Sequence, residues 1–201
     1  VMEADIEKGL YFGGVIIVAR GGELGLYEAV GHADAARSRP VRKDSVFSLF
    51  SVTKAFTNVL FFRAIELGQV ALTTRVAEVI PEFGGHGREK ITFLHLLTHT
   101  SGMPSVYTPK PGMCIDQLDE MIAAICAHVF PAELPGVRVD YSPLVNHVLM
   151  AEALRRTDPK RRGYRQMVQE DLLNPLRMPD TSVGLRADLK PRKVVPDFRG
   201  N

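Results

Sequence analysis

The sequence predicts an α/β (α+β) protein in which two antiparallel strands precede a mostly helical half. Two β-rich runs, residues 14–20 and 23–30, flank Gly21-Gly22, and a Gly-Gly pair between such runs is typical of a two-residue hairpin. Residues 51–68 form an apolar segment of helical length, and helical periodicity recurs through the rest of the chain. Because two strands do not make a stable sheet alone, we expect further polypeptide to complete it.

Composition places the chain among ordinary globular proteins, with 201 residues, 45% of them hydrophobic and 24% charged. A formal net charge of +2 is too small to attract nucleic acid, so no nucleic-acid partner is expected. No apolar run reaches the roughly 18–20 residues that span a bilayer, so no membrane span is expected. Cys114 and Cys126 are expected to be free thiols. The chain starts at Val1 without a signal-peptide pattern, which leaves cytoplasmic and periplasmic or secreted locations open.

The segment from Ser51 to Gly68 is expected to be a central helix, because its apolar residues lie on almost every side. Its polar exceptions, Ser51, Lys54 and Asn58, are three and four residues apart and therefore share one face. The elements predicted downstream are a turn of helix at 74–79, a short helix at 93–98 capped by Thr92, a helix within 115–130, a helix from Pro143 to about Arg156 capped by Ser142, a helix at 164–173 and a β-like run at 182–185.

The pattern Ser51-Val52-Thr53-Lys54 places an amine one helical turn from a hydroxyl. A serine hydroxyl needs a base to become a nucleophile, and a lysine amine can serve once burial or a helix N-terminus lowers its pKa. The S-x-x-K pattern is short, so another interpretation stays open at this level: Ser51 caps the helix and Lys54 lies in solvent.

Longer segments around this pattern carry a family resemblance. Residues 46–68 (VFSLFSVTKAFTNVLFFRAIELG) resemble the nucleophile region of the serine β-lactamase and penicillin-binding-protein superfamily. Residues 92–104 (TFLHLLTHTSGMP), 135–149 (PGVRVDYSPLVNHVL) and 172–181 (LLNPLRMPDT) resemble three further segments of its class C β-lactamase and family VIII carboxylesterase branch, in family order. The resemblance implies a β-lactamase/transpeptidase-like fold, in which an antiparallel sheet flanked by helices accompanies an all-helical lobe.

The resemblance also implies a division of the chain and roles for its residues. Residues 1–68 would supply the first strands and the nucleophile helix, 69–180 a mostly helical lobe, and 181–201 the start of a return to the sheet. The resemblance assigns catalysis to three residues: Ser51 as the acylated nucleophile, with Lys54 and Tyr141 sharing proton transfer. It assigns one oxyanion-hole donor to the Ser51 backbone N–H. No cofactor or metal is implied. By itself, Tyr141 would be interpreted as a packed aromatic residue with a satisfied hydroxyl.

Two departures from the family pattern affect function. The family often has Tyr-x-Asn where this chain has Tyr141-Ser142-Pro143, and proline has neither a side-chain donor nor an N–H. The family's third motif, on a later strand that supplies the second oxyanion donor, is absent from these 201 residues. We therefore expect an incomplete enzyme, in which a second polypeptide or a missing C-terminal segment completes the sheet.

Three functions remain in competition. The first is a carboxylesterase or acyl transferase that forms a covalent acyl-enzyme with small acyl esters, which the loss of the asparagine favours. The second is a β-lactamase or D-alanyl-D-alanine peptidase. The third is a non-catalytic binding protein with the same fold, because a fold alone does not fix a function.

Other patterns have simpler interpretations. His95 and His99 have a metal-ligand spacing, but leucine rather than glutamate follows the first, so we expect no metal and assign them hydrogen bonds around the adjacent Ser-Gly loop. Residues 84–87 (GGHG) lack the lysine of a phosphate cradle. The basic residues between 155 and 165 are expected to form a solvated face.

Overall fold

The computed structural model describes residues 1–197 of the chain. They fall into two compact units, which we call the strand unit (Val1–Phe50 with the chain from Met178 onward) and the helical unit (Ser51–Arg177). The boundaries expected from the sequence, after residues 68 and 180, differ from these units. The helix that follows Ser51 falls in the helical unit because it packs against the later helices there.

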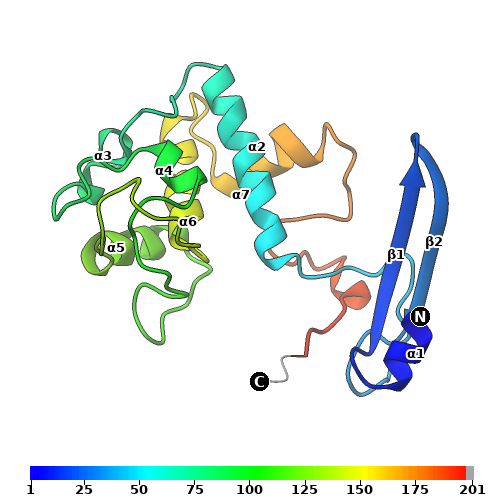
Figure 1. Cartoon of the computed structure of the whole chain (residues 1–201). Coiled ribbons are helices and arrows are strands. Elements are labelled where there is room, and N and C mark those ends of the chain that lie inside the picture. Colours follow the sequence, from blue (N-terminus) through cyan, green and yellow to red (C-terminus); the bar gives the residue numbers. More distant parts are fainter. Residues whose placement is uncertain (198–201) are drawn as a thin grey trace. The chain divides into compact units, whose positions relative to one another are not determined.

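The strand unit is built on the predicted hairpin, which the structure confirms. Strand β1 (Gly13–Arg20) pairs antiparallel with β2 (Glu23–Gly31), and the register shifts between Val18 and Ala19 (Figure 1). Both turn glycines have positive φ, which glycine adopts without a steric penalty. A short helix that the sequence did not predict, α1 (Met2–Glu7), contacts β2.

The core of the strand unit lies at one end of the hairpin. Ala33, Val41 and Val194 are buried there, against apolar residues from the first half of β1 and the second half of β2. The prediction of a β-like run at 182–185 is wrong, since these residues form no strand. Among the described residues that follow, only Lys193 makes a β-bridge, and its partner is Val46. β-propensity depends on available partners, and that run has none in the structure.

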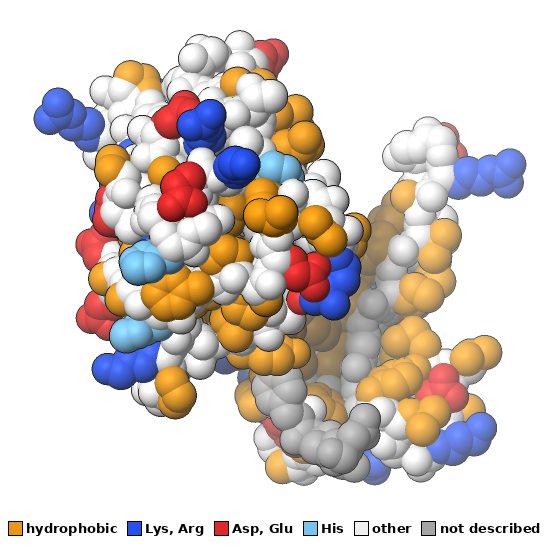
Figure 2. Space-filling view, turned by 60° about the vertical axis from the view of Figure 1, so that its left-hand side comes forward, with side chains coloured by type: hydrophobic (Ala, Val, Ile, Leu, Met, Phe, Trp, Pro, Cys, Tyr) orange, Lys and Arg blue, Asp and Glu red, His pale blue; other side chains and the backbone are white. Residues whose placement is uncertain are grey.

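Toward the turn, the hairpin is apolar and exposed. Ile16, Ile17 and Val18 in β1 are 37%, 58% and 49% exposed, and consecutive residues of a strand point to opposite faces. Leu24 and Leu26 in β2 are exposed as well, so neither face of this end is covered. Figure 2 shows hydrophobic side chains along the hairpin.

The helical unit contains six α-helices of four to fourteen residues (Figure 1). They are α2 (Thr53–Glu66), α3 (Val76–Val79), α4 (Phe93–Leu97), α5 (Leu118–His128), α6 (Val145–Thr157) and α7 (Tyr164–Val168). A turn of π-helix, Gln169–Leu173, continues α7, and 3-10 turns lie at Phe50–Val52 and Pro81–Phe83. In the part of the chain that the structure describes, no helix combines the length and the apolar character that crossing a bilayer requires.

Helix α6 is the centre of this unit, with eight buried residues and neighbours that include α2, α4 and α5. The expectation that α2 is covered on every side is wrong. Its Leu60, Phe61 and Ala64 are buried, whereas Val59 and Phe62 are 51% and 54% exposed. The helix therefore has one packed face and one apolar face that contacts solvent in the structure.

The helix starts follow local hydrogen bonding. Thr92 caps α4 as predicted, and its N–H donates to Nδ1 of His95, which completes a capping box. Helix α6 begins at Val145 and not at Pro143, although the Ser142 hydroxyl does accept a bond from the Asn146 N–H at 3.2 Å. The chain thus leaves residues 141–144 outside the helix, next to Lys54.

Candidate active site

Ser51 lies in a 3-10 turn immediately before α2. The N-cap of α2 is Val52, and no side-chain hydrogen bond caps the helix, so the interpretation of Ser51 as a capping residue does not apply. Phe50, directly before it, has φ +46°, a left-handed conformation that costs a non-glycine residue energy. The Ser51 side chain is therefore exposed, and its hydroxyl is not used to cap the helix.

Lys54 lies in the first turn of α2 and does not point into bulk solvent. Its Nζ donates to Ser51 Oγ at 3.1 Å and to the Pro143 carbonyl at 2.7 Å. Nζ also lies 4.9 Å from the centroid of the Tyr141 ring. Two of the three N–H donors of the ammonium group therefore have acceptors, and the cation also lies beside the Tyr141 ring.

Tyr141 completes the cluster, with its hydroxyl 2.5 Å from Ser51 Oγ. The interaction with Lys54, followed by the hydrogen bond with Ser51, holds the pKa of the Tyr141 phenol below its usual value, because both stabilise the phenolate. The ring itself is 47% exposed. The structure therefore brings the three sequence-predicted residues together in one hydrogen-bonded set.

Backbone hydrogen bonds between two segments of the chain fix the position of Tyr141. The backbone N–H groups of Ala132, Gly136 and Asp140 donate to the carbonyls of Gly102, Thr100 and His99, at 2.8–2.9 Å. At Gly102, φ is +73°, and a Cβ there would lie 2.2 Å from a backbone carbonyl of the facing segment. Only glycine permits this close approach, so the Ser-Gly of the first segment fixes the path of the second.

The sequence placed Asn58 on the same helix face as Ser51 and Lys54, but it did not identify the residues of α6 that surround this cluster. Asn58, one turn beyond Lys54 on α2, bonds to Nε2 of His147 on α6 at 3.0 Å. Burial, and then the charge of Lys54, lower the pKa of His147 to about 4, so this imidazole is neutral at neutral pH. Asn146 is fully buried and donates to the Leu96 carbonyl at 3.0 Å. Asn146 and His147 both lie in the segment 135–149 that resembles the family, but their spacing in the sequence predicted no role for either.

The two histidines with metal-ligand spacing have separate structural partners. The side chain of His95 belongs to the capping box of α4, and Nδ1 of His99 accepts the Ser142 N–H at 3.0 Å. The expected bonds to the Ser-Gly loop are therefore wrong for both side chains. Within residues 1–197, no group of three or more His, Cys, Asp or Glu residues is arranged to hold a metal ion.

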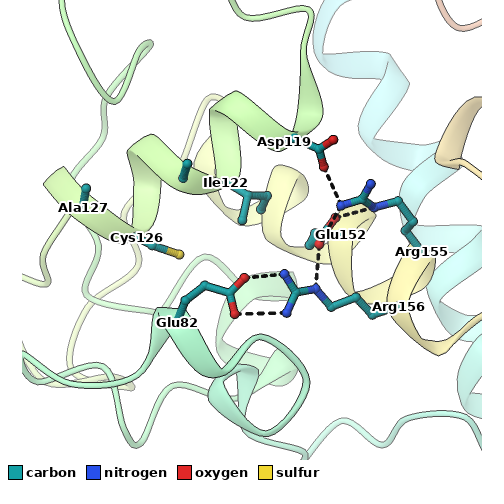
Figure 3. A pocket seen from close by; sticks show the side chains of 9 residues that line it. Glu82, Asp119, Ile122, Cys126, Ala127, Glu152, Arg155 and Arg156 are labelled. Carbon is teal, nitrogen blue, oxygen red and sulfur yellow. Dashed lines mark hydrogen bonds and ion pairs between the residues drawn. The ribbon is translucent and has the colours of Figure 1, made fainter.

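A pocket of about 520 Å³ lies apart from the cluster, between α5, α6 and the turn at Pro81–Phe83 (Figure 3). Its charged groups are paired with one another: Arg156 bonds to Glu82 and Glu152, and Arg155 to Glu152 and Asp119. The Glu152 side chain is fully buried, and a buried carboxylate requires such cations. Of the expected solvated basic face, Arg156 is exposed and Arg155 partly exposed even though both are ion-paired, whereas the expectation is wrong for Arg162, which is buried.

Comparison with known proteins places this geometry in a family. Esterase EstB from Burkholderia gladioli is 40% identical over 110 residues, which are 53% of this chain and 28% of EstB. The crystal structure of a family VIII carboxylesterase is 27% identical, with a TM-score of 0.78 over 96% of this chain and 52% of that chain. The crystal structure of a class C β-lactamase, 23% identical with a TM-score of 0.81 over the same shares, has the same fold.

The chain thus spans about half the length of these solved structures. The sequence profile described as Beta-lactamase matches residues 2–195, nearly the whole chain. The predicted resemblance and the predicted β-lactamase/transpeptidase-like fold are confirmed, and the chain belongs to the Beta-lactamase family, whose members similar to it include an esterase and β-lactamases.

Proposed function

We propose that this protein is a serine hydrolase that forms an acyl-enzyme on Ser51 and acts as a carboxylesterase or acyl transferase on small esters. The observation that carries the proposal is the contact of Ser51 Oγ with both the Tyr141 hydroxyl, at 2.5 Å, and Lys54 Nζ, at 3.1 Å. A nucleophile within hydrogen-bond reach of a base, and a base oriented by a third group, is the arrangement that nucleophilic catalysis requires.

The proton would move between Ser51 and Tyr141. The Tyr141 phenolate accepts the Ser51 proton while Oγ attacks the ester carbonyl, and Tyr141 then returns that proton to the leaving alcohol as the C–O bond breaks. In the second step, Tyr141 takes a proton from water or an acceptor alcohol, whose oxygen attacks the acyl carbon. The Ser51 oxygen leaves as an alkoxide and recovers the proton from Tyr141, so the enzyme is regenerated.

Lys54 fits the role of a cation better than that of the base. Nζ donates to the Pro143 carbonyl at 2.7 Å and lies 3.1 Å from Ser51 Oγ, whereas the Tyr141 hydroxyl lies closer to that oxygen, at 2.5 Å. The ammonium stabilises the phenolate of Tyr141, and this is the largest contribution to the lowered pKa of that residue. The division of roles makes Tyr141 the proton acceptor and Lys54 its electrostatic partner.

Pro143 supports an ester rather than an amide substrate. An asparagine in its place would offer an amide group to a β-lactam or peptide, and proline offers only its carbonyl, which already accepts a hydrogen bond from Lys54. The similarity to an esterase and to a family VIII carboxylesterase supports the same choice.

The proposal includes further polypeptide that completes the sheet, either a second chain or a continuation of this one. Both faces of the β1–β2 hairpin are apolar and exposed toward the turn, and uncovered apolar strands of this kind are a liability in a soluble protein. The family's second oxyanion donor would come from that polypeptide, and losing one such donor typically costs about 10²–10³ in rate.

The nucleophile can be identified by mass. A fluorophosphonate probe is expected to add once to this chain, and Ser51→Ala is expected to abolish the adduct, while Ser105→Ala, an exposed serine, leaves it unchanged. Lys54→Met and Tyr141→Phe should slow labelling by about 10²–10⁴, the usual contribution of proton-transfer catalysis. If the unmodified chain forms no adduct at any pH, the non-catalytic binding protein is the better interpretation.

The pH dependence of labelling tests the role of Tyr141. Only the phenolate accepts a proton, so the rate should fall as pH drops below the pKa of Tyr141, and the midpoint should lie below 10, the ordinary value for tyrosine. Lys54→Met should move the midpoint upward, because it removes the largest stabilisation of the phenolate, while Tyr107→Phe should not move it. A midpoint unchanged by Lys54→Met would contradict the mechanism.

Substrate preference can be measured directly. The protein is expected to turn over p-nitrophenyl butyrate and to leave a chromogenic cephalosporin nearly untouched. Pro143→Asn should raise the ratio of cephalosporin to ester turnover, with Pro111→Asn, an exposed loop position, as the matched control. Rapid cephalosporin hydrolysis without esterase activity would favour a β-lactamase or D-alanyl-D-alanine peptidase instead.

The polypeptide proposed to complete the sheet can be detected by intact mass and by amide hydrogen exchange. Protein isolated from its native cells should have an intact mass above 22.2 kDa, or a bound second chain, and should protect backbone amides at the outer edges of β1 and β2. The 201-residue chain alone should exchange those amides rapidly. A native protein of 22.2 kDa without a partner and with unprotected edges would refute this part of the proposal.

A further inference from the structure

His99 contacts Tyr141 and both of its neighbours in the chain. The His99 carbonyl accepts the Asp140 N–H at 2.8 Å, and its Nδ1 accepts the Ser142 N–H at 3.0 Å. Between these two bonds, the imidazole packs on the Tyr141 ring, with centroids 4.9 Å apart and planes inclined by 37°. One residue thus holds the backbone on either side of Tyr141 and its ring.

The position of Tyr141 depends on such contacts because no regular element fixes it. The residue lies in neither helix nor strand, three residues before the N-cap of α6, and its ring is about half exposed. Among the residues that the structure describes, the partner of its hydroxyl is one small target, Ser51 Oγ, and Lys54 Nζ lies 4.9 Å from its ring centroid. A displacement of about 1 Å can cost on the order of 10² in rate when it separates reacting groups.

We propose that His99, in its neutral form with Nδ1 unprotonated, is the positioning residue that keeps the Tyr141 hydroxyl on Ser51; its importance for catalysis rests on the function proposed above. Nδ1 faces a backbone N–H, so it must present a lone pair, and the ring proton lies on Nε2. Protonation of His99 places two donors opposite each other and breaks the bond to Ser142.

The surroundings of His99 keep it neutral. Lys54 on α2 acts on it electrostatically, His147 on α6 lies with its ring centroid 5.8 Å away, and the Asp140 carboxylate is paired with Arg138 at 3.8 Å. Burial, and then the Lys54 charge, lower the pKa of His99. The bond to Ser142 should therefore be intact at neutral pH and be lost as pH falls through that pKa.

The backbone of His99 suggests well-matched variants. Its φ of +56° suits glycine and asparagine. His99→Gly removes the acceptor and the ring without backbone strain, whereas His99→Asn retains an acceptor atom the same number of bonds from Cα and cannot be protonated there. His86, with φ +55° and its ring against Phe130, gives controls with the same two substitutions.

The test follows Tyr141 by NMR of the chain labelled with 13C at the tyrosine Cζ, with Tyr141→Phe assigning the signal. His99→Gly should raise the pKa of Tyr141 toward 10, because the hydroxyl leaves Lys54 and Ser51, while His99→Asn and both His86 variants should keep it low. Fluorophosphonate labelling should slow by about 10² in His99→Gly and largely recover in His99→Asn.

The NMR measurement needs no catalysis, so it decides the role of His99 even if the chain forms no adduct and the proposed function fails. If His99→Gly does not fold, acid titration provides the answer: the Tyr141 signal should show a transition below pH 6.5, the ordinary histidine pKa, in the unmodified chain and none in His99→Asn. An unchanged Tyr141 pKa in His99→Gly, or an acid transition that persists in His99→Asn, would overturn the inference.

Discussion

The ammonium group of Lys54 is the point on which the candidate site depends. It bonds to Ser51, three residues earlier, and to the Pro143 carbonyl, almost ninety residues later, and it lies 4.9 Å from the centroid of the Tyr141 ring. These contacts tie the lysine to both segments that carry the hydroxyls proposed to react, those of Ser51 and Tyr141. The rest of the helical unit serves to present α2 on one side of this cation and residues 141–143 on the other.

The second side of the site is held by backbone hydrogen bonds more than by helix packing. The chain from His99 to Gly102 runs beside residues 132–140, and the bonds between them guide the later segment to its place. Gly102 allows the two backbones to approach, and His99 extends the contact past Tyr141. Two residues with positive φ, Phe50 and His99, adjoin Ser51 and Tyr141, and backbone strain of this kind tends to collect at functional sites.

Much of this arrangement was predictable from local rules. The Gly-Gly hairpin, the helix after Ser51 and the Thr92 cap follow from residue chemistry that acts over a few positions. The meeting of Ser51, Lys54 and Tyr141 came from the family resemblance, since no short-range rule brings residue 141 to residue 51. The exposed face of α2 was missed because periodicity shows that a residue is apolar, not what covers it. The role of His99 was missed because a side chain bonded to a distant backbone N–H leaves no periodic trace.

The anchor of Lys54 on Pro143 has a consequence for how such sites diversify. The acceptor is a main-chain carbonyl, a group that all twenty amino acids possess, so replacing the side chain at this position leaves the cation tethered. The side-chain chemistry at residue 143 is thereby independent of the contact that anchors Lys54. A substitution at this one residue, natural or engineered, could therefore change which acyl groups are accepted while the contacts proposed to activate Ser51 are retained.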